Sequence, residues 1–297
     1  MSEEEPSVDA STQQPSASWF PSIPQPIKTI FDQFPLTTYP SNQAPLQYST
    51  RPNEPRLYVF TTPEDARLGL PSINPQCLKW QTYLKFTDIE FRTVPSNNHA
   101  SPNGVLPFLL PPKASTEETD VLLPIPSTRL QKWADAKACI DEDIENNMRL
   151  EAYSSLLDGK IRDAWLYTSY LNSPNFNSIT RKAYILPSTS NSIVRKFLSY
   201  QLQSAARDQL TKTSPYIDAD DLLAEAKRAF DSLSILLGND EYFFGQRKPG
   251  LFDASVFAYT HLILDEKLGW KHNLLAVYLK QNHNLVQHRD RLLETYF

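Results

Sequence analysis

The chain has 297 residues, a formal net charge of −5, 24 prolines, only seven glycines and two cysteines. This length allows one large domain or two small ones, and two cysteines without metal-ligand spacing exclude a disulfide-stapled scaffold. The acidic balance, without a basic block, argues against a nucleic-acid partner. The longest markedly apolar uncharged run, residues 254–264, is too short to cross a bilayer as a helix.

Glycine is too scarce for the common phosphate-binding loops. The sequence contains neither G-x-G-x-x-G nor G-x-x-x-x-G-K-[ST], whose backbone N–H groups hold phosphates. The five histidines are scattered, and the acidic run at 141–145 lacks the ligand order of a calcium loop. We therefore predict no cofactor and no metal site.

Residues 1–55 differ from the rest of the chain, because they hold ten of the 24 prolines. The acidic, Ser/Pro/Gln-rich composition of residues 1–18 predicts a disordered tail and does not fit a mitochondrial presequence. We interpret residues 19–55 as a docking arm. Its candidate docking residues are the large side chains between the prolines: Trp19, Phe20, Ile27, Ile30, Phe31, Phe34 and Tyr39. Ile27 to Phe34 have helical spacing, and the pattern leaves open whether the arm docks on a partner or on the chain's own body.

Residues 56–126 show the order β-α-β-β-β. Short apolar or alternating runs predict strands at 57–60, 89–94, 105–110 and 120–123. Asn74-Pro75 places an N-cap residue before a proline, which predicts a helix over 75–86. Residues 61–74 read as a loop. The proline inside the third run, Pro107, indicates an edge or a special backbone state.

Beyond residue 127 the pattern is helical almost throughout. Apolar residues at helical spacing predict helices over 130–138, 144–156, 221–237 and 285–296. Residues 254–264 are apolar on nearly all sides, which predicts a helix buried within a bundle. The sequence thus predicts a small α/β domain at 56–126 followed by an all-α domain at 127–297.

This architecture, with Leu106-Pro107 before a strand, resembles the glutathione-transferase fold, in which a thioredoxin-like domain precedes a helical bundle. Three longer stretches are similar to metaxins. They are YLKF at 83–86 with SPNGVLPF at 101–108, YFFG at 242–245 with FDASVF at 252–257, and the last helix with its Tyr296-Phe297 end. They cover most of residues 56–297, with a weak match over 150–220.

Within the metaxins, the chain resembles the second-metaxin branch and its fungal counterpart in the mitochondrial sorting and assembly machinery, which lack a membrane anchor. The resemblance implies a non-catalytic, peripheral subunit on the cytosolic face of the mitochondrial outer membrane. Its expected partners are the β-barrel core subunit, a first-metaxin-like subunit and β-barrel precursor proteins, whose recognition and insertion it would assist. A weaker alternative is a general adaptor whose arm binds an unrelated partner.

Cys77 supports a rival function, a cytosolic glutathione-dependent thiol transferase. A thiol in the first turn of a helix lies at the positive end of the helix dipole, which lowers its pKa. Transferases hold the γ-glutamyl end of glutathione with an acid and a serine where the fourth strand turns into the next helix. That place is expected at 123–126, where Pro124 and Pro126 lack an N–H and Ile125 lacks a polar group. Ser127 would lie two or three positions too late.

The resemblance gives structural roles to two further residues. It implies a cis peptide bond before Pro107. It also implies that Asp253, near the start of the buried helix, accepts backbone N–H bonds as half of a capping box, with Gly250 in place of the usual Ser or Thr.

Overall fold

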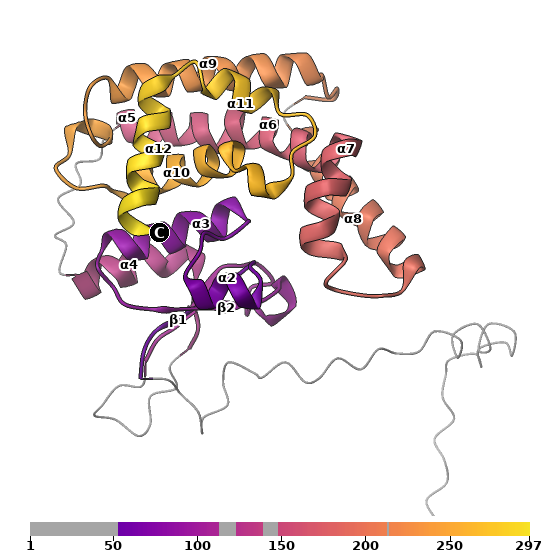
Figure 1. Ribbon diagram of the computed structural model, residues 1–297, viewed down its shortest axis with the longest axis horizontal. Helices are drawn as coiled ribbons and strands as arrows, with labels where there is room; N and C mark the ends of the chain where they lie inside the picture. The colour runs from indigo at the N-terminus through magenta and orange to yellow at the C-terminus, as the bar shows by residue number, and fades with distance from the viewer. Residues whose placement is uncertain (1–52, 113–122, 139–147, 213) are drawn as a thin grey trace, which may run out of the picture. The chain divides into compact units, whose positions relative to one another are not determined.

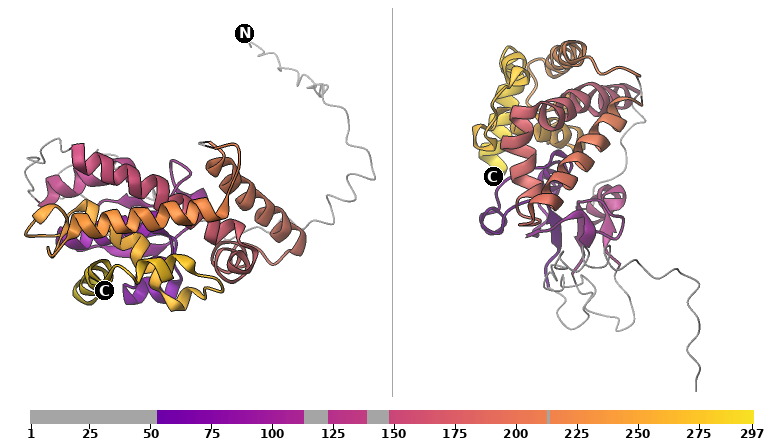
Figure 2. Two further views of the ribbon diagram at one scale, coloured as in Figure 1. Left: turned by 90° about the horizontal axis from the view of Figure 1, so that it is seen from above. Right: turned by 90° about the vertical axis from the view of Figure 1, so that its right-hand side faces the viewer.

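The computed structural model describes residues 53–112, 123–138, 148–212 and 214–297. The predicted disordered tail and nearly all of the predicted docking arm lie outside these residues. Among the described residues the strands all precede residue 127, and the segments after it are helical. Figures 1 and 2 show these elements from three sides.

The four strands form one mixed sheet in the order β2-β1-β3-β4. Strand β1 pairs parallel with β2 and antiparallel with β3, and β3 pairs antiparallel with β4. The parallel pair requires a crossover, which runs through α3. The strands are β1 (Arg56–Val59), β2 (Arg92–Pro95), β3 (Phe108–Leu110) and β4 (Ile125–Pro126).

One predicted strand is displaced along the chain, and another falls largely outside the described residues. Strand β2 begins three residues later than the predicted 89–94, because the backbone N–H of Ile89 still donates to the carbonyl of Leu84 at the end of α3. The fourth strand of the described sheet is Ile125–Pro126, which pairs with β3. Nearly all of the strand predicted at 120–123 lies outside the described residues.

The helix predicted at 75–86 is present as α3 (Pro75–Phe86), with Asn74 as its N-cap and Pro75 in the first turn. A short helix, α2 (Pro63–Leu68), occupies part of the stretch that the sequence predicts as a loop. The Thr62 hydroxyl accepts from the backbone N–H of Asp65 at 3.1 Å, and Gly69 ends the helix with a positive φ of 69°. Thr62 and Pro63 therefore start a helix.

The remaining helices follow β4. They are α4 (Ser127–Ala138), α5 (Met148–Leu156), α6 (Arg162–Leu166), α7 (Ser173–Asn175), α8 (Ser192–Leu210), α9 (Ala219–Leu237), α10 (Leu251–Leu264), α11 (Leu274–Leu279) and α12 (His283–Tyr296). The π-helical segments η3 (Leu157–Ile161), η4 (Tyr167–Leu171) and η5 (Phe176–Ile185) join several of them. Asp218 caps α9, because its Oδ1 accepts from Asp220 N at 2.9 Å and Asp221 N at 3.2 Å.

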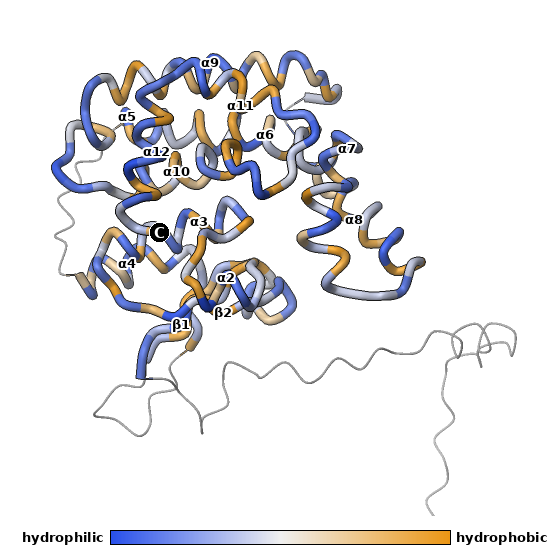
Figure 3. The backbone as a smooth tube through the Cα atoms, in the orientation of Figure 1, coloured by the Kyte–Doolittle hydropathy of each residue, from blue (hydrophilic) through white to orange (hydrophobic). Residues whose placement is uncertain are grey.

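Helix α10 is the centre of the core, as the all-round apolar pattern predicts. Every residue from Phe252 to Ile263 is buried, and α10 packs against α3 on one side and α12 on another. Figure 1 shows α3 between α10 and the strands. One continuous hydrophobic core therefore joins the sheet and the helices. In Figure 3 the outer helix α9 alternates between blue and orange, as an amphipathic helix does.

Candidate functional site

The start of α3 is where the rival, enzymatic function would place its chemistry. Asn74 Oδ1 accepts from the backbone N–H of Gln76 at 3.1 Å and of Cys77 at 3.2 Å. The first-turn N–H groups that could hold an anion or a thiolate are therefore bonded to the cap. The hydrogen bonds of this helix start therefore stabilise the helix.

Cys77 is present in the first turn, but its side chain is fully buried. Burial raises the pKa of Cys77 to about 12, which outweighs the hydrogen bonds from Phe60 and Ser72 that lower it. The sequence expectation of a lowered pKa is therefore wrong, because desolvation exceeds the effect of the helix dipole. The thiolate is the reactive form, so a thiol in this environment is a poor nucleophile at neutral pH.

A tyrosine from the helical region covers this end of α3. Asn74 Nδ2 donates to the Tyr184 hydroxyl at 3.3 Å, and the Tyr184 ring meets Phe60 edge to face with centroids 4.9 Å apart. Burial raises the pKa of Tyr184, and Tyr170 adds to the shift. Tyr184 thus lies against the start of α3, where the Cys77 side chain has no exposed surface.

The β4–α4 junction differs from the sequence expectation. Because β4 is Ile125–Pro126, Ser127 directly follows the strand as the first residue of α4. The expectation that Ser127 lies too late is wrong, and a serine does occupy the place where the fourth strand turns into the helix. The residue before it is Pro126, which has neither a carboxylate nor an N–H, so the acidic member of a γ-glutamyl site is missing.

The bond before Pro107 is cis, as the resemblance implies. Leu106, which precedes it, is buried, and its backbone N–H donates to Asn98 Oδ1 at 3.0 Å. Pro107 leads directly into β3, next to the central strand β1.

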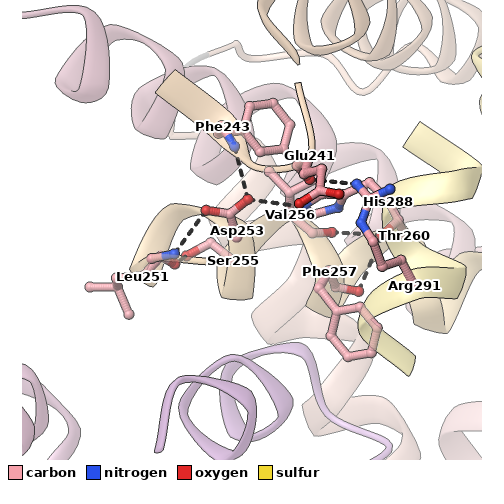
Figure 4. A network of polar contacts seen from close by, with 11 residues as sticks. Glu241, Phe243, Leu251, Asp253, Ser255, Val256, Phe257, Thr260, His288 and Arg291 are labelled. Carbon is pink, nitrogen blue, oxygen red and sulfur yellow. Dashed lines mark hydrogen bonds and ion pairs between the residues drawn. The ribbon is translucent and has the colours of Figure 1, made fainter. Parts of the chain in front are cut away.

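Asp253 belongs to a second, fully internal network, which Figure 4 shows. Its Oδ2 accepts from Gly250 N at 2.9 Å, and its Oδ1 accepts from Phe243 N at 3.0 Å. Oδ1 also lies 2.9 Å from Nε2 of His288, whose side chain is 0% exposed. The carboxylate therefore joins the start of α10, the loop before it and α12.

The His288 contact was not predictable, because the sequence shows His288 only as one of five scattered histidines. Tyr184 was equally hidden, since it lies in the stretch 150–220 where the resemblance is weak. The docking residues Trp19, Phe20, Ile27, Ile30, Phe31, Phe34 and Tyr39 lie outside the described residues. Within the described ranges, no group of three His, Cys, Asp or Glu side chains could hold a metal ion.

An open depression of about 620 Å³ lies between α2 and β2. Charges of both signs line it, among them Arg67, Arg92 and Glu90. None of the predicted site residues takes part in it, and its mixed charge selects no class of ligand.

Three family models match the chain. The model described as glutathione S-transferase N-terminal domain matches residues 75–176, and the C-terminal domain model matches residues 226–292. A third, described as SAM35, subunit of the SAM complex, matches residues 22–71. The two transferase matches and the strand order confirm the predicted fold, a thioredoxin-like domain followed by a helical bundle.

Solved structures of transferases are similar to the chain at low identity. Glutathione S-transferase III in apo form is 13% identical with a TM-score of 0.45, over 82% of this chain and 95% of that chain. Glutathione transferase Omega 1C from Trametes versicolor is 12% identical with a TM-score of 0.47, over 83% and 92%.

The similar curated proteins are metaxins. Human Metaxin-1 is 28% identical over 239 residues, which are 77% of this chain and 49% of the human protein. Metaxin-3 of Xenopus laevis is 29% identical over 239 residues, or 77% of this chain and 74% of that protein. The chain thus matches about half the length of the human protein. Together with the metaxin-like sequence stretches, these relatives show that the chain is similar to metaxins over 77% of its length.

Proposed function

We propose that the chain is a non-catalytic, peripheral subunit of the mitochondrial outer-membrane sorting and assembly complex, where it assists recognition and insertion of β-barrel precursors. The observation that carries the proposal is the match of the SAM-complex subunit model to residues 22–71. That range contains Ile27, Ile30, Phe31, Phe34 and Tyr39 of the predicted docking arm and runs into β1 and α2. The sequence that resembles a subunit of the complex is therefore the sequence expected to make contacts.

The proposed partners follow from the same match. The β-barrel core subunit is the expected receptor for the arm, and a first-metaxin-like subunit and β-barrel precursors complete the set. No nucleic-acid partner is proposed. Assignment to the second-metaxin branch remains a prediction, since the reported relatives are Metaxin-1 and Metaxin-3.

The geometry at α3 supports a role without catalysis. The buried, protonated Cys77, the capped N–H groups and the Tyr184 cover leave no approach for a thiol substrate. Pro126 replaces the acid that a γ-glutamyl group would need. We therefore disfavour the thiol-transferase function, although Ser127 lies where β4 turns into α4, the position of the serine in a glutathione site.

We further propose that residues 56–126 and 127–297 are the two domains and that Pro107 and Asp253 are structural residues within them. The cytosolic face of the mitochondrial outer membrane is the proposed location. The described part of the chain has no helix of membrane-spanning length and hydrophobicity. Alkaline carbonate should release much of a peripheral subunit from mitochondrial membranes, whereas complete retention in the pellet would contradict this location.

The assay for the proposed function is β-barrel assembly in isolated mitochondria. Depletion of the chain should slow the assembly of an imported β-barrel precursor while matrix import continues. Re-expression of the Cys77→Ser variant should restore assembly fully, because the proposal gives the thiol no chemical role. Normal β-barrel assembly after depletion, or failure of a folded Cys77→Ser variant to restore it, would contradict the proposal.

A further inference from the structure

Helix α8 carries an apolar face that the described residues leave uncovered. Ile193, Phe197 and Tyr200 are 61%, 64% and 66% exposed. They lie at i, i+4 and i+7, so they form one stripe along the first half of the helix. Val194, 37% exposed, lies beside them.

The opposite side of α8 is fixed to the molecule. Ala206 and Leu210 are buried, and Gln203 Nε2 donates to the carbonyl of Tyr170 at 3.2 Å. At the start of the helix, Arg195 Nε donates to the carbonyl of Thr189 at 2.6 Å. The stripe therefore has a defined direction, outward, and Figures 1 and 2 show α8 at the outer edge of the helical region beside α7.

The charge around this stripe is opposite to that of the whole chain. Residues 163–208 contain five basic residues against two acidic ones, Asp163 and Asp208, although the formal net charge of the chain is −5; Asp208 is exposed on α8. The five are Arg181, Lys182, Arg195, Lys196 and Arg207. Lys196 and Arg207 are exposed on α8, and Lys182 is exposed on η5, which packs against α8. Within the described residues these three side chains form no ion pair.

We propose that this face of α8 binds the surface of a membrane that contains anionic phospholipids. An interfacial helix places apolar and aromatic side chains at the boundary of headgroups and acyl chains and presents Lys and Arg to the phosphates. Ile193 and Phe197 supply the apolar contact, Tyr200 has a ring with a polar end suited to that boundary, and Lys196 and Arg207 flank the stripe at helical spacing.

The charge pattern favours a lipid surface over a second copy of the chain. Two copies meeting through α8 would bring together the exposed Lys182, Lys196 and Arg207 of each copy, against one exposed acid of α8 per copy, Asp208, and the excess of like charge opposes such a contact. The inference goes beyond the proposed function, which assigns attachment to protein partners. Its test needs none of those partners, so its failure would leave the proposed function standing.

The experiment is sedimentation of the purified full-length chain with vesicles of phosphatidylcholine alone or of phosphatidylcholine with phosphatidylserine. The chain should bind the phosphatidylserine vesicles and release them as salt rises, because salt screens exposed charges. Lys196→Glu should weaken binding at least fivefold, since each basic residue near an anionic surface contributes about a fivefold gain. Phe197→Ser should weaken it by a similar or larger factor.

Two matched variants control for general effects of charge and hydrophobicity. Ile235→Ser removes another strongly exposed apolar residue, from α9, and Lys248→Glu reverses another exposed lysine. Both should bind the vesicles like the parent chain. Thermal melts should confirm that all four variants fold, as expected for exposed positions.

The proposal is overturned if the chain does not prefer phosphatidylserine vesicles or if the control variants lose as much binding as the α8 variants. It is also overturned if Phe197→Ser leaves vesicle binding intact but converts a dimer into a monomer in light scattering, because the face would then bind a second copy. Capture of an acidic protein by this face, without vesicle binding, overturns it as well.

Discussion

Asn74 joins the start of α3 to Tyr184 of η5 through a 3.3 Å hydrogen bond from Nδ2 to the tyrosine hydroxyl. The same side chain caps α3 through Oδ1. One asparagine therefore satisfies the helix start and ties it to the residue that covers Cys77. Asn74 and Tyr184 therefore make internal contacts at the helix start where the thiol-transferase hypothesis places its chemistry.

The contribution of Asn74 to stability can be compared with that of a residue that only caps a helix. Asn191 caps α8 through Oδ1 in the same way, with bonds to Ile193 N and Val194 N. Loss of a cap costs about 1 kcal/mol, so Asn191→Ala should lower the free energy of unfolding by about that amount. Asn74→Ala should cost more, and a double-mutant cycle with Tyr184→Phe should give a coupling of about 0.5–1.5 kcal/mol. Equal costs and no coupling would contradict the linkage.

Cys77 should be chemically silent in the folded chain. In a Cys139→Ser background, a thiol-specific reagent at neutral pH should label Cys77 only as fast as the protein opens, because the thiol is buried and its pKa is raised to about 12. Calorimetry should show no saturable glutathione binding. Fast labelling of the native protein, or micromolar binding that Cys77→Ser abolishes, would restore the transferase hypothesis.

Removal of Asp253 should destabilise the chain strongly. Asp253→Ala leaves the N–H groups of Phe243 and Gly250 and the ring of His288 without their acceptor. A buried donor left without its acceptor costs about 1–3 kcal/mol, and this substitution affects three contacts at once. Asp290→Ala is the matched control, because the side chain of Asp290 is 48% exposed in its pair with Arg289, and pairs open to solvent contribute at most about 1 kcal/mol. Similar unfolding midpoints for the two variants in urea would refute the role of the internal network.

Acid should destabilise the chain through His261. Burial, with Arg289 and Lys267 nearby, lowers the pKa of His261 to about 3, so below its ordinary pKa the unfolded chain binds a proton that the folded chain excludes. The contribution of neutral His261 to the free energy of unfolding is therefore present above about pH 6.5 and is lost as the pH falls toward 3. The loss amounts to about 2 kcal/mol between pH 7 and pH 5. His261→Phe preserves a ring against Phe257, which lies 5.3 Å away, and should flatten this dependence.

The control for the pH experiment is His283→Phe, because His283 is exposed on α12. Its dependence of unfolding free energy on pH should match that of the parent chain. An unchanged slope in His261→Phe, or an equal change in both variants, would contradict the assignment to His261.

Elements with strong local signals were predictable from the sequence. The Asn-Pro start defined α3, and the all-round apolar run defined α10. Strand positions were less predictable, because β4 has only two residues and its place is set by pairing with β3. Tyr184 contacts Asn74 across 110 positions of the sequence, and His288 contacts Asp253 across 35 positions. No local sequence pattern predicts contacts over such separations.

The predicted docking arm can be tested by two changes to the full chain. Phe31→Ala with Phe34→Ala removes half of the apolar face expected at 27–34 and should reduce recovery of partner subunits while leaving the melting temperature unchanged. If the melt falls by several degrees first, the arm packs on the chain's own body. Unchanged melting with unchanged partner recovery would contradict both versions.

Membership of the outer-membrane assembly complex is tested most directly by affinity purification from mitochondria. The tagged full chain, solubilised in mild detergent and identified with its companions by mass spectrometry, should recover the β-barrel core subunit and a first-metaxin-like subunit in amounts comparable to its own. Recovery of the chain without a β-barrel membrane protein, from mitochondria in which the complex is intact, would contradict the account.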